Sequence, residues 1–165
     1  MYKGVIFDLD QTIVDSRIAE QFRKERYWAK VYSLIPSFKL YSGFEDVFRH
    51  IRLKEIKVCI VTTSPGIYVN KVVSHFRIPC HGVVDYFSVK PLKPHPNQML
   101  KALELLEMTN IDVISFGDRG VDIQASNSAG IKSVGCEWGT QEIQILKSSN
   151  PNRLITSPIE IIQFL

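Results

Sequence analysis

Short apolar runs alternate along the chain with segments whose apolar residues recur at the spacing of a helix. Continuous apolar runs are typical of strands buried on both faces. They predict strands at residues 4–7, 58–61, 83–86, 112–116 and 131–134. Apolar spacings of three and four positions predict helices at about residues 18–32, 44–51, 66–76, 96–106 and 120–129, with a last helix after residue 157.

Strands separated by helices imply right-handed crossovers and a parallel sheet covered on both faces. We therefore expect an α/β fold, a Rossmann-like three-layer sandwich with a mostly parallel sheet. The chain shows no internal repeat, low-complexity segment or long linker, so residues 1–165 are predicted to form one domain.

Several residues mark the predicted helix ends and faces. Ser64 is expected to be an N-cap with Pro65 at the first helical position, and the pair Ser157-Pro158 repeats this device. Gly130 is expected to end the helix before it. In the helix that begins near Pro96, we expect the apolar residues to face inward, and they are Met99, Leu100, Leu103 and Leu106.

Composition narrows the class of protein. The 165 residues are 45% hydrophobic, with no apolar run long enough to cross a bilayer and no secretory signal at the start, so we expect a cytoplasmic protein with no membrane partner. The net charge of +3 is mild and does not by itself support a nucleic-acid partner. Cys59, Cys80 and Cys136 lack metal-ligand spacing.

Polar side chains gather where the predicted strands end. In open α/β sheets, ligands bind beyond the carboxyl ends of the strands. The polar residues that follow the first, second and fourth strands, or lie in the loop before a helix, are Asp8, Asp10, Thr12, Thr62, Thr63, Ser64, Lys93, Asp118 and Asp122. Each has an ordinary structural explanation alone, such as a turn, a helix cap or a solvated loop lysine. Their arrival at one rim favours a functional site.

Asp8 and Asp10 are two positions apart, so on an extended segment their side chains share a face. One carboxylate can attack as a nucleophile and form an aspartyl-phosphate. The other can protonate the leaving oxygen and then activate water. A phosphoryl group approaches several carboxylates only when their charge is compensated, and a hard cation suits that task.

Four segments in order resemble the motifs of the haloacid dehalogenase-like hydrolase superfamily. They are Asp-Leu-Asp-Gln-Thr at residues 8–12, Val-Thr at 61–62, Lys-Pro-His-Pro at 93–96 and Phe-Gly-Asp-Arg-Gly-Val-Asp at 116–122. The segments 127–130 and 138–139 also resemble the tail of the phosphatase branch. Gln11 departs from the glycine that is most frequent at this position, and its role is open.

The resemblance implies a magnesium-dependent phosphatase acting on a phosphorylated substrate. It assigns the nucleophile to Asp8 and the acid–base role to Asp10. It places Mg²⁺ on Asp8, the backbone carbonyl of Asp10, and Asp118, with Asp122 supporting the metal shell or holding Lys93. Lys93, Thr62 and Thr63 would bind the phosphoryl group.

Many relatives carry a lid over this site, and here the room for one is short. We expect an insert at about residues 15–41, formed by one long helix plus a loop, and an open active site. An open site is compatible with a phosphorylated macromolecule as substrate. It is also compatible with a small phosphorylated substrate that a second copy or a partner protein encloses. The insert is rich in Lys, Arg and aromatic residues; we interpret these as a solvated face and packing rather than as a binding surface.

Three other functions stay open to different degrees. A phosphate-binding or regulatory module with little turnover does not need an acid at Asp10. A phosphotransferase would pass the phosphoryl group to an acceptor hydroxyl instead of water. A dehalogenase does not need to protonate an alkoxide, so the presence of Asp10 argues against it.

Overall fold

The chain is built around β1 (Gly4–Phe7), the third strand of a six-stranded parallel sheet. The computed structural model describes residues 1–165. The strand order is β5-β4-β1-β6-β7-β8, and every neighbouring pair is parallel. The other strands are β4 (Lys57–Val61), β5 (Gly82–Val84), β6 (Val113–Gly117), β7 (Lys132–Cys136) and β8 (Arg153–Ile155). The predicted α/β sandwich is confirmed, while β8 was not predicted.

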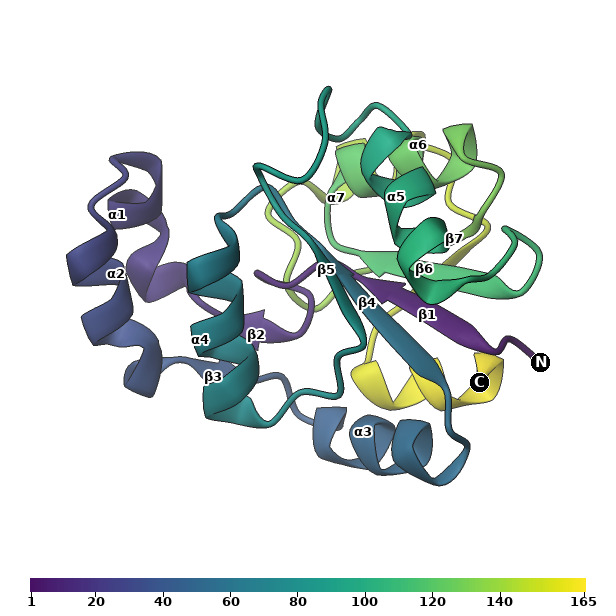
Figure 1. Cartoon of the computed structure of the whole chain (residues 1–165), viewed down its shortest axis with the longest axis horizontal. Helices are drawn as coiled ribbons and strands as arrows, with labels where there is room; N and C mark the ends of the chain where they lie inside the picture. The colour runs from purple at the N-terminus through teal and green to yellow at the C-terminus, as the bar shows by residue number, and fades with distance from the viewer.

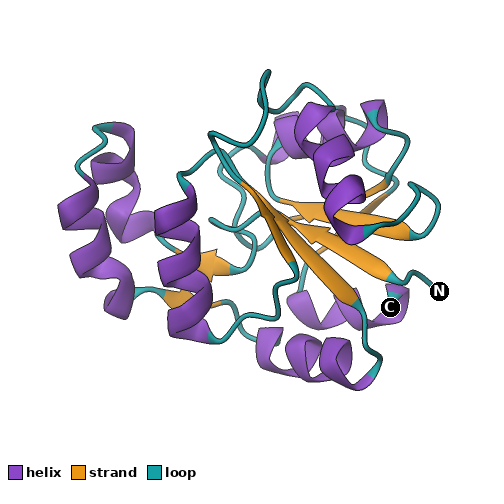
Figure 2. Ribbon diagram, viewed as in Figure 1, coloured by secondary structure: helices purple, strands orange, loops and turns teal.

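Helices cover both faces of the sheet (Figures 1 and 2). They are α3 (Phe44–Leu53), α4 (Gly66–Phe76), α5 (Asn97–Leu106), α6 (Gly120–Ser128), α7 (Ile143–Ser148) and the 3-10 helix η3 (Pro158–Phe164). In β1, Val5 and Phe7 point into the core shared with α3, α4 and η3, and Ile6 points into the core shared with α5 and α6. This alternation is the period of two expected of a strand. No helix is both long and apolar enough to cross a membrane.

Two predicted helix details were wrong. Helix α4 begins at Gly66 with Pro65 at the N-cap position, and the carboxylate of Asp85 accepts the Gly66 N–H at 2.7 Å, so Ser64 is not the cap. Leu100 faces outward and is 48% exposed, because the buried face of α5 is formed by Met99, Ala102 and Leu106 together with one polar residue, Gln98.

The segment between β1 and α3 folds differently from the single long helix that we predicted. It contains β2 (Val14–Asp15), the turn η1 (Arg17–Ala19), α1 (Glu20–Lys24), α2 (Trp28–Leu34), the turn η2 (Ile35–Ser37) and β3 (Lys39–Leu40). Arg26 adopts a left-handed φ of 56°, which ends α1 and reverses the chain. Helices α1 and α2 therefore form a short hairpin beside α4 (Figure 1). Ile18, one of the apolar residues whose spacing predicted a helix at residues 18–32, is 56% exposed.

An aromatic cluster joins the core to the carboxyl end of the sheet. The ring of Phe44 lies 5.9 Å from that of Phe7, 5.4 Å from that of Phe48 and 6.2 Å from that of Trp138. The indole N–H of Trp138 donates to the carbonyl of Thr12 at 2.9 Å. Packing around Phe44 thus supports the loop that follows β1.

We expect Phe44→Ala to lower the free energy of unfolding by about 3–5 kcal/mol, the usual cost of truncating a fully buried Phe. Equilibrium unfolding in urea measures the change. Leu53→Ala is the matched control, since Leu53 lies in the same helix but is 76% exposed, and its change should stay within about 0.5 kcal/mol. Equal losses in the two variants would contradict this account of the core.

Candidate active site

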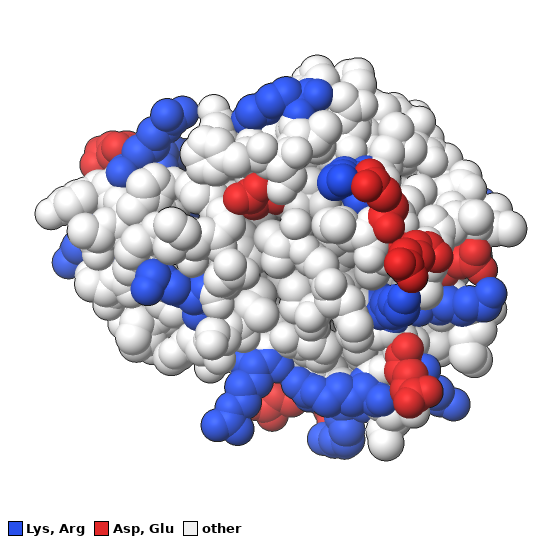
Figure 3. Space-filling model, in the orientation of Figure 1, with Lys and Arg blue, Asp and Glu red and all other residues white.

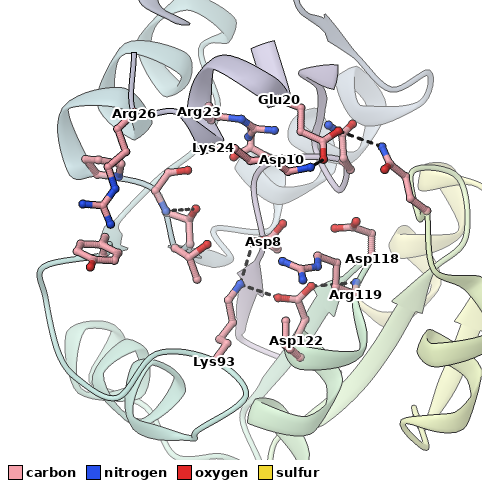
Figure 4. A pocket seen from close by; sticks show the side chains of 18 of the residues that line it. Asp8, Asp10, Glu20, Arg23, Lys24, Arg26, Lys93, Asp118, Arg119 and Asp122 are labelled. Atoms are coloured by element: carbon pink, nitrogen blue, oxygen red, sulfur yellow. Dashed lines mark hydrogen bonds and ion pairs between the residues drawn. The ribbon is translucent and has the colours of Figure 1, made fainter. Parts of the chain in front are cut away.

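A single cleft of about 560 Å³ lies beyond the carboxyl ends of β1, β4 and β6. Its lining includes all seven side chains predicted from the sequence to form the site, which are Asp8, Asp10, Thr62, Thr63, Lys93, Asp118 and Asp122. Figure 4 labels Asp8, Asp10, Lys93, Asp118 and Asp122 and shows them arriving from different segments of the chain, with Lys93 and Asp122 on one side of Asp8. The sheet edge therefore brings together residues that are far apart in the sequence.

Lys93 is the central cation of the cleft, and its side chain is only 2% exposed. Its ammonium donates to Asp8 at 2.9 Å, to Asp122 at 2.6 Å and to the carbonyl of Val61 at 3.0 Å. Burial lowers the pKa of Lys93, but the charges of Asp122 and Asp8 outweigh that effect and raise the pKa above its usual value. Lys93 thus stays charged in a site with little water.

The loop that carries Lys93 is fixed by a buried glutamine of α5. The backbone N–H of Lys93 donates to the side-chain oxygen of Gln98 at 3.1 Å. The amide group of Gln98 in turn donates to the carbonyl of Thr62 at 2.9 Å, so it links this loop to the end of β4. Sequence reasoning missed Gln98, whose signal was a polar residue on an otherwise apolar helix face.

Two of the cleft carboxyls lie where their charge is poorly solvated. Burial raises the pKa of Asp8 from 3.8 to about 7, with the neighbouring Lys93 opposing the shift. Burial also raises the pKa of Asp118 well above its usual value, and the charges of Asp8 and Asp122 add to that effect. A cation in addition to Lys93 would therefore favour the ionised form of both groups at neutral pH.

The carboxylate oxygens of Asp8, Asp118 and Asp122 lie within 4.8 Å of one another, an arrangement that suits a hard divalent cation. Both oxygens of Asp122 are already engaged, one by Lys93 and the other by the backbone N–H of Arg119 at 3.0 Å. Asp8 uses one oxygen on Lys93, and Asp118 uses one on the hydroxyl of Thr12 at 2.9 Å. The second oxygens of Asp8 and Asp118 are thus better placed to hold a metal than either oxygen of Asp122.

Asp10 lies across the cleft from Lys93, and its contacts converge on one oxygen. Its Oδ1 accepts the hydroxyl of Ser16 at 2.6 Å and the hydroxyl of Tyr68 at 2.5 Å, and it forms an ion pair with Arg23. The other carboxylate oxygen, Oδ2, is left for a further partner. Ser16, Tyr68 and Arg23 were not predicted as site residues from the sequence.

The basic residues of the insert do not all lie on a solvated face, and that interpretation was wrong for Arg23. Its side chain is only 13% exposed and reaches into the cleft (Figure 4). The cleft lining also includes Glu20, Lys24, Arg26 and Trp28. Basic side chains gather elsewhere too, including the lower edge of the face in Figure 3, over α3. The contact of Arg23 with Asp10 identifies it as a site residue, and the positive charge of the insert was not sufficient to predict this.

Thr62 and Thr63 differ in their surroundings. Thr62 is buried, and its hydroxyl oxygen accepts the backbone N–H of Ser64 at 3.1 Å, so its own proton remains available as a donor. Thr63 is exposed at the cleft surface. Arg119, rather than Asp118, occupies the N-cap position of α6, so Asp118 is not a helix cap.

The side chain of Gln11 is accommodated in an unusual backbone conformation. Its φ is 65°, in the left-handed region that favours glycine. The side chain accepts the hydroxyl of Tyr41 at 3.1 Å and donates to Ser16 at 3.4 Å. These contacts give a physical reason why a side chain is held at a position that favours glycine.

Residues 18–136 match a family profile described as "Haloacid dehalogenase-like hydrolase". The matched stretch includes Thr62, Lys93 and Asp118 and begins after the Asp8–Thr12 segment. The sequence is 27% identical over 131 residues to a pyrophosphatase, PpaX, of Bacillus cereus. That alignment covers 76% of this chain and 59% of the relative, so the chain spans about three fifths of the relative's length.

Solved structures share the fold over almost the whole chain. CbbY from Rhodobacter sphaeroides, in complex with phosphate, aligns with a TM-score of 0.82 and 17% identity, covering 98% of this chain and 96% of that one. A β-phosphoglucomutase from Clostridium difficile aligns with a TM-score of 0.78 and 22% identity, covering 99% and 96%. At these identities the similarity concerns the fold alone.

The acidic cluster predicts a pH-dependent response to magnesium. Asp8 has a higher pKa in the folded chain, about 7, than the 3.8 of an ordinary aspartate. The folded chain therefore binds more protons at this group between these pH values, and the metal-free protein loses stability as the pH rises through the window. Mg²⁺ requires the ionised carboxylates, so it should raise Tm strongly at pH 8 and little at pH 5.

Differential scanning fluorimetry with a magnesium titration measures this response. Asp118→Asn, which keeps the size of the side chain, should reduce the Mg²⁺ shift at pH 8, whereas the exposed Asp46→Asn should preserve it. An equal Mg²⁺ shift at both pH values would contradict a site made of these carboxylates.

Proposed function

Because the chain belongs to the haloacid dehalogenase-like hydrolase family, we propose that it is a magnesium-dependent phosphatase that hydrolyses phosphomonoesters through an aspartyl-phosphate on Asp8. The observation that carries this proposal is the contact of Lys93 with Asp8 and Asp122, beside Asp118. It supports the proposal because a buried cation lies beside the carboxylate that we propose as the nucleophile. We treat residues 1–165 as one catalytic unit, with the insert at residues 15–41.

In the first step, an oxygen of Asp8 attacks phosphorus and forms the acyl phosphate, while the bond from phosphorus to the ester oxygen breaks. Asp10 gives its proton to that leaving oxygen. Lys93 lies 2.9 Å from Asp8, so one of its N–H groups can be shared with an equatorial phosphoryl oxygen. The hydroxyls of Thr62 and Thr63, which also line the cleft, would supply further donors.

In the second step, a water molecule attacks the phosphorus of the acyl phosphate and passes a proton to Asp10. The bond between phosphorus and Asp8 breaks, which releases phosphate and restores both carboxyl groups. The free Oδ2 of Asp10 is the oxygen through which both transfers run, since Oδ1 already accepts two hydroxyl groups and pairs with Arg23.

The donor set fits Mg²⁺, with Asp8, Asp118 and the backbone carbonyl of Asp10 as its proposed ligands and Asp122 as the group that holds Lys93. The bound cation would neutralise charge on the phosphoryl oxygens and on the carboxylates. Four carboxylates, Asp8, Asp10, Asp118 and Asp122, face two inner cations, Lys93 and Arg23, which leaves two negative charges when all are ionised. A divalent cation balances them.

The substrate is a phosphorylated compound of small to moderate size, and a cleft of about 560 Å³ fits that range. We expect the activity in the cytoplasm. We also propose that a second copy or a partner protein closes the cleft, and size-exclusion chromatography with substrate tests this.

We expect Asp8→Asn to lower kcat on phosphomonoesters by roughly 10³-fold or more, because the amide cannot form the acyl phosphate. Asp10→Asn should lower kcat by about 10²- to 10⁴-fold through loss of acid–base catalysis. Phosphate release from a panel of phosphorylated metabolites, with Mg²⁺ present, measures both changes.

Asp46→Asn is the control, since this acid is exposed on α3 and pairs with Arg49. It should match the unaltered protein. If the unaltered protein binds phosphate with magnesium but releases none from any ester, the chain is a phosphate-binding module instead. If phosphate reaches an added alcohol faster than water, it is a phosphotransferase.

A further inference from the structure

The ion pair between Arg23 and Asp10 connects the insert to the proposed acid–base group. Arg23 extends from α1 into the cleft, and its guanidinium carbon lies 5.9 Å from the centre of the Tyr68 ring. Its side chain is 13% exposed and that of Asp10 is 14% exposed, so little water separates the pair. An Arg side chain remains charged at any pH at which proteins are active.

The contact with Asp10 puts Arg23 beside the group that the substrate loses. In the proposed reaction Oδ2 of Asp10 contacts the leaving oxygen, while its Oδ1 accepts the hydroxyls of Ser16 and Tyr68 and pairs with Arg23. An anionic feature carried on the leaving group would therefore lie beside the Arg23 guanidinium.

Arg23 has the capacity to bind such a feature. A guanidinium has five N–H donors arranged to hold two oxygens of a carboxylate or phosphate. The neighbouring cations have other partners, since Lys24 pairs with Glu20 at 2.7 Å and the guanidinium carbon of Arg26 lies 5.9 Å from the ring centre of Tyr86. Arg23 is the cation of the insert that touches a catalytic carboxylate.

We infer that Arg23 binds a second anionic group, a carboxylate or a second phosphate, carried on the leaving group of the substrate. The inference rests on the proposed function. The N–H groups of Arg23 that do not contact Asp10 would hold the substrate anion while Oδ2 of Asp10 contacts the leaving oxygen. Because Arg23 contacts Asp10 and Asp10 must reach the leaving oxygen, the two anionic groups are only a few bonds apart.

Paired substrates test this site, each pair differing in the second anion. Phosphoglycolate against ethyl phosphate tests a carboxylate, and propanediol bisphosphate against propyl phosphate tests a phosphate. The unaltered protein should prefer the doubly anionic member of at least one pair in kcat/KM. Arg23→Ala should lower the ratio of kcat/KM between the doubly and the singly anionic member of that pair by about 10- to 100-fold, the range for a charged hydrogen-bonded contact.

Arg23→Lys should recover part of the preference, because a lysine keeps the charge but not the fork of donors. Lys30→Ala is the control, since Lys30 lies on α2 of the insert outside the cleft lining and changes the net charge equally. An equal fall for both members of each pair in Arg23→Ala would assign Arg23 a structural role and overturn the inference. Hydrolysis of the simple esters without any preference would do the same and leave the proposed function intact.

A binding measurement separates the inference from turnover. Calorimetry with Mg²⁺ compares phosphonoacetate with methylphosphonate, two compounds that this reaction cannot hydrolyse and that differ by a carboxylate. Phosphonoacetate should bind about 10-fold or more tightly to the unaltered protein, and Arg23→Ala should remove that difference. Equal binding of the two compounds by the unaltered protein would overturn the inference even if no ester is hydrolysed.

Discussion

A lysine with almost no exposure to water holds the cleft together. Lys93 can be buried only because its ammonium donates hydrogen bonds to Asp8, to Asp122 and to the carbonyl of Val61. Removing one partner from a buried pair of this kind costs several kcal/mol, because the other charge is left uncompensated. The contact also fixes the position of three segments, the end of β1, the start of α6 and the loop before α5, around one point.

The two aspartates of the first loop have contrasting surroundings. Burial disfavours the ionised form of Asp8 and raises its pKa to about 7, so the carboxylate needs cations to compensate its charge. Asp10 has three donors on one oxygen and faces the insert. The two aspartates thus have different partners. Asp8 contacts Lys93 and would contact the proposed metal, whereas Asp10 contacts Arg23 and Tyr68. This difference suits a nucleophile and an acid–base group.

The parallel sheet and the grouping of these side chains in one cleft could be predicted from the sequence, because both depend on local patterns. Apolar runs identified β1, β4 and β6, and the rule that ligands bind at carboxyl ends placed Asp8, Lys93 and Asp118 together. The fold of the insert could not be predicted in the same way. The chain reversal at Arg26 depends on the packing of α1 and α2 beside α4. Arg23 and Tyr68 could not be assigned to Asp10 from spacing, because their contact is made only through that packing.

Chemical identification of the phosphorylated residue tests the central claim most directly. Asp10→Asn should slow release of the phosphoryl group. With an aryl phosphate, whose leaving oxygen needs no proton, the first step still proceeds, so a reaction with Mg²⁺ can be stopped by acid with the intermediate present. Borohydride reduction then converts an acyl-phosphorylated aspartate into homoserine, which peptide mass spectrometry locates. The account predicts homoserine at position 8 and nowhere else in the cleft. Its appearance at position 118 or 122, or phosphate release with no modified aspartate, would contradict the account.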